Sequence, residues 1–245
     1  MKPLKKLGQN FLIDKTIINK IVKNACLTKQ DIVLEIGPGL GALTKELVKH
    51  SKKVIAIEKD KRLIPFLKKL NNAEIMENDV LKYEIPDFKY KIVANLPYNI
   101  GLKIIRKFIE ANNPPLEMIV MVQKEVAQKI CSSKSSLPKI AVSFFAEAEI
   151  LFFVPKTCFY PQPKVDGAVM KIKNIQKNTP DVNQELFFKI LRKGFSFPRK
   201  TILNNLKQFK TDTLKWLKKA GISPLKRPED LKLEDWVKLC NGFEK

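Results

Sequence analysis

Histidine and cysteine are scarce in this chain of 245 residues. It contains one histidine, His50, and four cysteines that lie far apart, with no CxxC pair. Structural zinc sites and disulfide scaffolds need several of these residues in close spacing, so neither is expected here. We expect no metal site, and a single histidine excludes nearly all histidine-dependent catalysis.

Long hydrophobic runs and a signal peptide are also missing. No apolar stretch approaches the roughly 18–20 residues that span a membrane. The first residues, MKPLKKLGQNFL, lack the apolar core of a signal peptide. Since 44% of the residues are hydrophobic and 29% are charged, the composition is that of a globular protein. We expect a cytoplasmic protein with no membrane association.

Acidic residues are few relative to basic ones. The 25 Asp and Glu residues stand against 46 Lys and Arg residues, which gives a formal net charge of +21. Such a charge attracts polyanions, most often nucleic acid, although a general preference for lysine would produce the same excess. Residues 31–90 carry a net charge of only +1, whereas residues 1–30, 91–178 and 179–245 carry +6, +7 and +7. We therefore expect nucleic acid to contact the basic segments and the neutral segment to have another role.

Hydrophobic periodicity divides the chain into two parts. Over about the first 178 residues, short apolar runs alternate with amphipathic stretches, which is typical of an α/β fold with a parallel sheet. Strands are expected at 32–36, 54–57, 73–76, 91–94, 118–122, 149–154 and 168–172, the last two as an antiparallel pair. Helices are expected at 14–25, 61–70, 99–111 and 124–131, and another should follow the glycine- and proline-containing turn after the first strand and end at about residue 49. A loop is expected at 132–138. Beyond a polar linker every periodic stretch is helical, so we predict an α/β domain over 1–178 and a helical domain over 179–245.

A glycine-rich turn follows the first of these strands, with the sequence Glu35-Ile-Gly37-Pro-Gly39-Leu-Gly41. Glycines let the backbone turn sharply and let a ligand approach closely. A dinucleotide site needs GxGxxG, but the spacing here is GxGxG behind an acidic residue. S-adenosylmethionine has no phosphate and carries an ammonium and a sulfonium group, so a nearby carboxylate suits it. The pattern favours this cofactor, although a tight turn without a ligand has the same spacing.

Two more acids stand at expected strand ends. Glu58 ends the second strand, 21 residues after Gly37, where a carboxylate can accept both hydroxyls of a ribose. Asp79 follows the third strand, where it can accept from the exocyclic amine of adenine. Because ligands collect at the carboxyl ends of such strands, these acids predict an adenosine pocket. Solvated loop acids are the alternative.

The fourth strand ends in Asn95-Leu96-Pro97-Tyr98. The exocyclic nitrogen of adenine is a poor nucleophile because its lone pair is delocalised into the ring. The Asn95 side chain and the Leu96 backbone carbonyl can accept its two hydrogens and free the lone pair for attack on a methyl group. Tyr98 offers a face on which an unpaired base can stack. An ordinary β-turn is the alternative.

Eight segments that occur in order carry a resemblance to one enzyme family. They are LGQNFL (7–12), VLEIGPGLGALT (33–44), VIAIEKD (54–60), ENDVL (77–81), NLPYNI (95–100), MVQKEVAQKI (121–130), FYPQPKVDGAV (159–169) and RKTILNNL (199–206). Over about residues 4–240 the chain closely resembles the ribosomal RNA adenine dimethyltransferases, specifically the KsgA (RsmA) type, which acts on small-subunit ribosomal RNA.

The resemblance implies a fold, an activity and partners. The fold is a Rossmann-like class I S-adenosylmethionine-dependent methyltransferase domain, with a mostly parallel seven-stranded sheet that has a C-terminal antiparallel hairpin, plus a small all-helical C-terminal domain. The activity is dimethylation of N6 of two adjacent adenosines in the 3′-terminal hairpin of small-subunit (16S) ribosomal RNA, late in subunit biogenesis. The expected cofactor is S-adenosylmethionine, and the expected partner is that RNA within an immature small ribosomal subunit. The enzyme is expected to be a monomer.

The resemblance also assigns roles to residues. It implies that the cofactor is held by Asn10, Leu12, Gly37, Gly39, Glu58, Asp79 and Asn95, that Asn95, Leu96 and Tyr98 are catalytic, that the target base stacks on Tyr98 and Phe159, and that RNA contacts Arg199 and Lys200. Core packing is the alternative for Phe159, and a solvated charged face is the alternative for Arg199 and Lys200. Leu7, Lys156 and Pro198 depart from the family pattern, which leaves details of RNA contact open.

Two other functions stay compatible with the sequence. Large-subunit adenine methyltransferases that give macrolide resistance share NLPY, but the C-terminal RKTILNNL and LKLEDWVKL favour the small-subunit type. A non-catalytic RNA-binding assembly factor on the same fold would be expected to lose Glu58, Asp79 or NLPY, and all are present. DNA adenine and protein glutamine methyltransferases typically carry proline where Leu96 stands, which argues against both.

Overall fold

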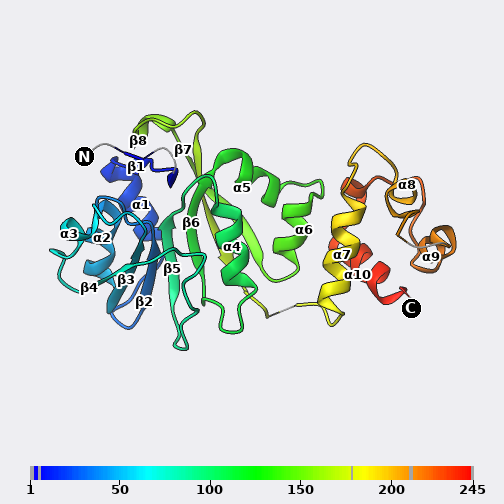
Figure 1. Cartoon of the computed structure of the whole chain (residues 1–245), viewed down its shortest axis with the longest axis horizontal. Coiled ribbons are helices and arrows are strands. Elements are labelled where there is room, and N and C mark those ends of the chain that lie inside the picture. Colours follow the sequence, from blue (N-terminus) through cyan, green and yellow to red (C-terminus); the bar gives the residue numbers. More distant parts are fainter. Residues whose placement is uncertain (1–2, 5–6, 178, 210–211, 244–245) are drawn as a thin grey trace. The chain divides into compact units, whose positions relative to one another are not determined.

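The computed structural model describes residues 3–4, 7–177, 179–209 and 212–243, and these form two compact units (Figure 1). The first unit consists of Met1–Gln128 and Ala146–Gln176, and the second of Lys129–Phe145 and Lys177–Lys245. The predicted domain boundary at residue 178 lies outside the described residues. The segment 129–145 was expected in the first domain, but it packs with the C-terminal helices, where the rings of Phe144 and Phe187 have centroids 4.4 Å apart.

The strands of the first unit confirm the predicted fold class. The described strands are β1 (Phe11–Leu12), β2 (Ile32–Ile36), β3 (Lys53–Glu58), β4 (Ala73–Glu77), β5 (Lys91–Asn95), β6 (Met118–Gln123), β7 (Glu147–Val154), β8 (Phe159–Tyr160) and β9 (Gly167–Lys173). Seven of them form one sheet in the order β4-β3-β2-β5-β6-β9-β7. The sheet is parallel except for β9, which runs antiparallel to β6 and to β7.

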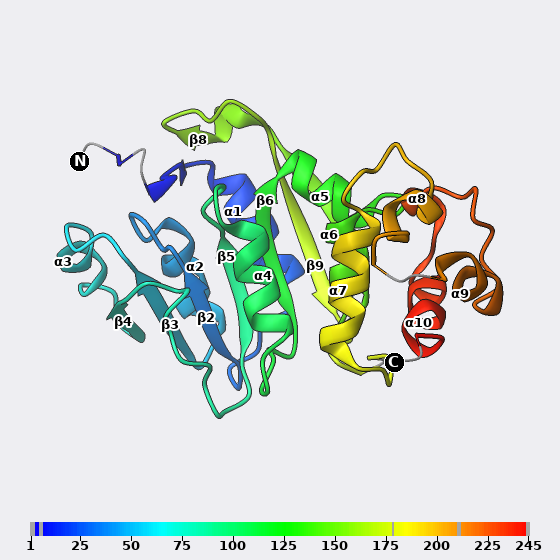
Figure 2. The same ribbon diagram turned by 45° about the vertical axis from the view of Figure 1, so that its right-hand side comes forward.

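Helices cover both faces of this sheet (Figures 1 and 2). Over both units together, the described helices are α1 (Lys15–Asn24), α2 (Ala42–His50), α3 (Ile64–Leu67), α4 (Gly101–Ile109), α5 (Lys124–Cys131), α6 (Leu137–Ser143), α7 (Gln184–Gly194), α8 (Ile202–Leu206), α9 (Thr213–Lys219) and α10 (Leu233–Asn241). On one face, Ile21 of α1 and Leu47 of α2 share a buried core with Val33, Val54 and Val93 of three neighbouring strands. The ribbon views show α4 on the other face. None of the described helices has both the length and the apolar character needed to cross a membrane.

One helical prediction and the end of one predicted loop were wrong. The helix expected at 61–70 is reduced to α3, because the flanking turns are closed by hydrogen bonds between residues three apart, such as Leu63 N–H to the Asp60 carbonyl (2.9 Å). The loop expected at 132–138 ends early, because α6 starts at Leu137. The Ser136 hydroxyl caps α6 by accepting the Lys139 N–H at 3.2 Å, and Pro138 lies in the first turn, where its missing N–H costs nothing.

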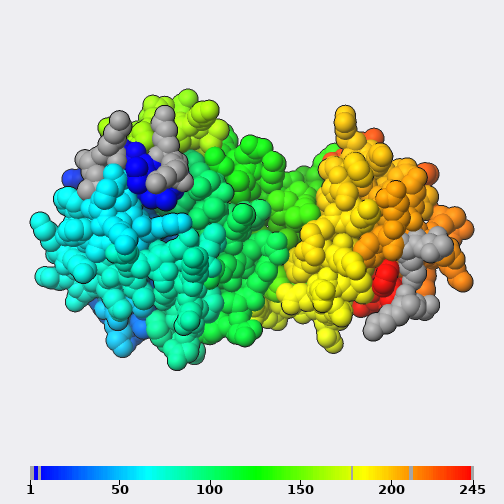
Figure 3. Space-filling view, viewed as in Figure 1, coloured from blue at the N-terminus to red at the C-terminus, as the bar shows by residue number. Residues whose placement is uncertain are grey.

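The N-terminal leader, residues 7–12, is held by a strand pair that the periodicity did not predict. Phe11 pairs with Tyr160 and Leu12 with Phe159 in the antiparallel ladder of β1 and β8. In the space-filling view the leader, in dark blue, lies against the cyan residues that follow β3 (Figure 3). The leader therefore lies near the edge of the sheet where β2, β3 and β5 end.

Candidate active site

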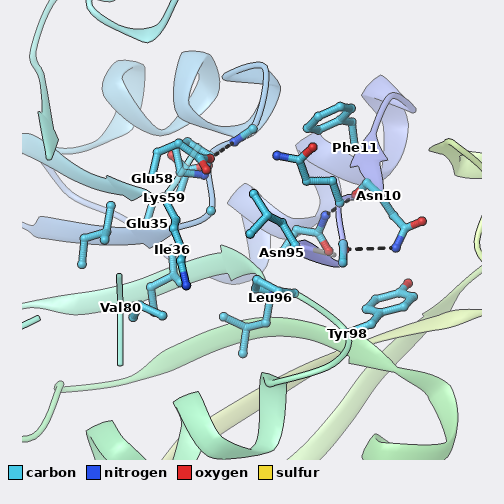
Figure 4. Close-up of a pocket in the computed structure, with 18 of the residues that line it drawn as sticks. Asn10, Phe11, Glu35, Ile36, Glu58, Lys59, Val80, Asn95, Leu96 and Tyr98 are labelled. Carbon is cyan, nitrogen blue, oxygen red and sulfur yellow. Dashed lines mark hydrogen bonds between the residues drawn. The ribbon is translucent and has the colours of Figure 1, made fainter. Parts of the chain in front are cut away.

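A cavity of about 410 Å³ lies at the carboxyl ends of β2, β3, β4 and β5 and is closed on one side by the leader. It brings together most of the predicted site residues, namely Asn10, Leu12, Gly37, Gly39, Glu58, Asp79, Asn95, Leu96 and Tyr98. Glu58 and Glu35 lie on one side of it, and Asn10, Asn95 and Tyr98 lie on the other (Figure 4). Strand ends contributed by parallel neighbours meet at this edge, so side chains distant in sequence share one cavity.

The glycine turn has a shape that only glycine adopts without strain. Gly37 and Gly39 have positive φ angles of 67° and 60°. A Cβ atom on Gly39 would lie 2.7 Å from the Phe11 ring, so this glycine also makes room for the leader. Gly39 thus serves the close packing of the leader as well as the wall of the cavity.

Glu58 is fixed by two backbone donors. Its Oε2 accepts the Gly39 N–H at 3.2 Å, and its Oε1 accepts the Asp60 N–H at 2.8 Å. Only 6% of the residue is exposed. Burial raises the pKa of this carboxyl group, and the backbone hydrogen bonds from Asp60 and Gly39 oppose that shift. The carboxylate is therefore held rigidly in the cavity wall and ties the glycine turn to the end of β3.

Glu35 is the acid that precedes the glycine turn. It is 1% exposed, and burial raises its pKa to about 8, with the Thr44 hydroxyl opposing the shift and the Glu58 charge adding to it. The side chain is therefore mostly protonated at neutral pH, which relieves repulsion from Glu58. A cation bound nearby would lower this pKa and restore the carboxylate.

Asp79 follows β4 and carries a charge. Its Oδ2 is 2.8 Å from the Lys59 Nζ, and its Oδ1 accepts the Leu81 N–H at 3.0 Å. The hydrogen bond from Lys59 lowers the pKa of this carboxyl group. Asp79 lines the cavity as an ionised acceptor, and its predicted contact with adenine stays a prediction.

Asn95 lies at the end of β5, and only one of the two polar atoms of its side-chain amide has a hydrogen-bond partner. Its Nδ2 donates to the Asn10 carbonyl at 3.0 Å, whereas its Oδ1 is buried without a hydrogen-bond partner (Figure 4). The next residue, Leu96, is held by its N–H, which donates to the Met121 carbonyl at 3.0 Å. A buried amide oxygen without a partner is costly, and no hydrogen-bond donor in the described part of the protein satisfies this one.

Tyr98 and Phe159 lie next to each other. Their ring centroids are 6.1 Å apart in an edge-to-face arrangement. Burial raises the pKa of the Tyr98 phenol, and the charge of Asp166 adds to the rise, so the hydroxyl stays protonated and cannot act as a base at neutral pH. Phe159 is only 3% exposed and belongs to the same buried core as Leu12. It packs in the core here, and its stacking on a target base stays a prediction.

Sequence patterns did not indicate the contacts that hold the leader. Gln9 Nε2 donates to the Asp60 Oδ2 at 2.8 Å, and its Oε1 accepts the Leu4 N–H at 2.7 Å. Asp60 is 4% exposed, and the guanidinium of Arg62 lowers its pKa. No periodic signal marks such long-range polar contacts. Only the resemblance, which assigns Asn10 and Leu12 to cofactor binding, indicated that this segment reaches the site.

The predicted RNA contacts Arg199 and Lys200 lie in the second unit. Both are exposed in the turn between α7 and α8, with the Lys200 Nζ 4.6 Å from the centroid of the Phe197 ring. Their contact with RNA stays a prediction.

Within the described residues there is no cluster of three or more His, Cys, Asp or Glu side chains that could hold a metal ion.

Comparison with known proteins identifies relatives over nearly the whole chain. The profile of a family described as "Ribosomal RNA adenine dimethylase" matches residues 2–245. The Ribosomal RNA small subunit methyltransferase A of Enterococcus faecalis is 40% identical over an alignment of 268 positions, which covers 98% of this chain and 90% of that protein. The protein of the same name from Dehalococcoides mccartyi is 43% identical over 256 residues, covering 98% and 88%.

Solved structures agree with this relationship. The crystal structure of a dimethyladenosine transferase from Plasmodium falciparum has a TM-score of 0.80 and 29% identity, and the alignment covers 94% of this chain and 95% of that one. The 23S rRNA methyltransferase ErmE has a TM-score of 0.73 and 26% identity, with 95% and 99% covered. With a family profile that matches residues 2–245 and curated relatives that are 40% and 43% identical, this chain belongs to the ribosomal RNA adenine dimethylase family.

Proposed function

We propose that this protein transfers methyl groups from S-adenosylmethionine to N6 of two adjacent adenosines in the 3′-terminal hairpin of small-subunit ribosomal RNA. The observation that carries the proposal is the Asn95 Oδ1, which is buried without a hydrogen-bond partner on a residue that lines the cavity at the carboxyl ends of the strands. The curated relatives named small subunit methyltransferase A support the choice of RNA.

S-adenosylmethionine fits the residues that line the cavity. Glu58 is positioned to accept from the ribose hydroxyls, and Asp79 is positioned to accept from the adenine amine. The backbone of Gly37 and Gly39 leaves room for the methionine part, and the leader residues Asn10 and Leu12 close the cavity. When bound, the cofactor supplies an electrophilic methyl group.

The residues of the NLPY segment prepare the target base. The Asn95 Oδ1 and the Leu96 carbonyl accept the two hydrogens of the adenine N6, which localises the nitrogen lone pair. Tyr98 gives the base a face to stack on, and its protonated hydroxyl takes no proton from it. No strong base is needed before transfer, because N6 becomes acidic only after it carries the methyl group.

The RNA partner contacts the second unit through a turn that the protein holds rigid. Asn205 is 2% exposed and clamps this turn: its Oδ1 accepts the Phe197 N–H at 2.9 Å, and its Nδ2 donates to the Phe197 carbonyl at 3.1 Å and to the Lys200 carbonyl at 3.3 Å. A preorganised turn loses little entropy on binding. Arg199 and Lys200, exposed on it, are placed to bind phosphates.

Replacing Arg199 and Lys200 together by alanine should reduce the salt dependence of RNA binding. Each lost phosphate contact reduces the slope of log K against log salt by roughly 0.7–0.9, so the double variant should lose up to about two units. Binding isotherms from low to moderate salt measure the slope. The matched control is Lys68→Ala with Lys69→Ala, two exposed lysines of the charge-neutral segment, which should leave the slope unchanged. An equal change in both double variants would contradict the assignment.

The natural substrate is an immature small ribosomal subunit in the cytoplasm, on which the enzyme acts as a monomer. A basic surface alone cannot select one hairpin among many, so the shape of the particle must contribute. The deciding experiment incubates the purified protein with S-adenosylmethionine and one of three substrates: immature small subunits, deproteinised small-subunit RNA, or large-subunit RNA.

Mass spectrometry of RNA fragments should find an adjacent pair of dimethyladenosines in the small-subunit RNA, with the highest yield from immature particles. Methylation confined to large-subunit RNA would favour the macrolide-resistance type of activity instead. No methylation of any substrate would favour a non-catalytic assembly factor. Equal activity on particles and on deproteinised RNA would contradict recognition of the particle.

A further inference from the structure

The Asn95 Oδ1 must point toward the cavity if it is to accept a hydrogen bond from the N6 of adenine. An amide side chain can rotate so that either the oxygen or the nitrogen points inward. Here the nitrogen is engaged by the Asn10 carbonyl at 3.0 Å, and an oxygen in its place would face another oxygen. The carbonyl of Asn10 therefore fixes which end of the Asn95 amide is left free to accept a hydrogen bond, namely the oxygen.

The Asn10 carbonyl is in place only while the leader is anchored. On one side of Asn10, Gln9 donates to Asp60 at 2.8 Å. On the other side, Leu12 pairs with Phe159, and the Phe11 ring lies over Gly39, where no Cβ atom intervenes. The leader is thus held at the end of β3 through Asp60 and at β8 through Phe159, and its residues line the cavity.

Asp60 is a firm anchor for Gln9. It is 4% exposed and ionised, and the Arg62 guanidinium donates to both of its oxygens, at 2.9 Å to Oδ1 and 2.6 Å to Oδ2. The Asp60 N–H in turn donates to Glu58, the proposed ribose acceptor. The anchor of the leader and the cofactor wall are therefore parts of one hydrogen-bonded network.

We propose that the leader orients the catalytic amide, and that Gln9 is a positioning residue for Asn95 that acts through the Asn10 carbonyl. This inference rests on the proposed methyl transfer to adenine. It goes beyond a cover for the cofactor, because it makes the chemical step itself depend on the leader. A leader that only covers the cofactor would affect binding of S-adenosylmethionine and leave transfer intact once the cofactor is saturating.

The test is Gln9→Glu, which keeps the shape of the side chain and places a carboxylate against the Asp60 carboxylate. Single-turnover transfer is measured at saturating S-adenosylmethionine and RNA, and cofactor affinity is measured separately by calorimetry. We expect the transfer rate to fall by about 10- to 100-fold at saturation, because small displacements of catalytic groups have effects of this size. The matched control is Gln30→Glu, the same charge change at an exposed position outside the cavity, which should keep the wild-type rate.

Two results would overturn the inference. One is a wild-type transfer rate in Gln9→Glu at saturating cofactor, whether or not cofactor affinity falls, and the other is an equal loss in Gln30→Glu. Thermal unfolding checks whether Gln9→Glu is folded. If it is not, Gln9→Ala serves as the test variant, because it removes the hydrogen bond to Asp60 without adding a charge. Gln9→Ala should also lower the transfer rate. The wild-type protein separates this question from the proposed function: no transfer by the wild type refutes the function, whereas transfer by the wild type and by Gln9→Glu alike refutes only the inference.

Discussion

Asn95→Ala should lower the single-turnover rate of methyl transfer by about 10²–10³-fold, the size of effect seen when one preorganised hydrogen-bonding group at a reacting centre is removed. The variant loses the Oδ1 that is buried without a partner and that we propose as the acceptor for N6. RNA affinity should change little, because the charged surfaces stay intact. Rapid-quench measurements with saturating RNA and cofactor give the rate.

Two variants make this experiment specific. Asn19→Ala removes an exposed asparagine of α1 and should keep the wild-type rate. Asn95→Asp keeps an acceptor but replaces the donor to the Asn10 carbonyl by an oxygen, so it should be impaired as well. An unchanged rate in Asn95→Ala would mean that the catalytic loop is misassigned.

Glu58→Gln should raise the dissociation constant of S-adenosylmethionine by about 10- to 100-fold, close to the effect of Glu58→Ala. Hydrogen bonds to a charged acceptor contribute about 1.5–3 kcal/mol, which corresponds to this range. The isosteric amide should not rescue binding, because Gly39 N–H and Asp60 N–H each donate to one carboxylate oxygen and an amide has only one oxygen. The amide nitrogen would face a backbone donor and push the glycine turn away.

Calorimetry with S-adenosylmethionine measures this loss, and thermal unfolding without cofactor checks that the variants are folded. The control is Glu46→Gln on α2, where the same change breaks only an exposed ion pair with Lys49 and should leave cofactor affinity within about twofold. Wild-type affinity in Glu58→Gln would show that the carboxylate does not contact the ribose.

Local patterns in the sequence determined most of the fold. Strands such as 32–36, 118–122 and 168–172 were predicted within two residues of their observed ends. The signal for such a strand, a short apolar run bounded by glycine or polar residues, is contained in the local sequence. Glu58, Asp79 and Asn95 line one cavity for the same reason: each ends or follows a parallel strand, and such ends meet at one edge. The start signals of α6, Ser136 and Pro138, were also present in the sequence but were assigned to a loop.

Only the tertiary structure decided how these residues are oriented and charged. Gln9 and Asp60 are 51 positions apart and Asn10 and Asn95 are 85 apart, so no periodicity relates them, and the chain must be folded before either hydrogen bond exists. Burial is likewise a property of the assembled molecule: it encloses Phe159 in the core and keeps Glu35 protonated near neutral pH. The sequence by itself placed Glu58, Asp79 and Asn95 at one edge of the sheet. Packing of distant segments decided which atom each presents there and in which protonation state, because desolvation and hydrogen-bond geometry arise only when those segments meet.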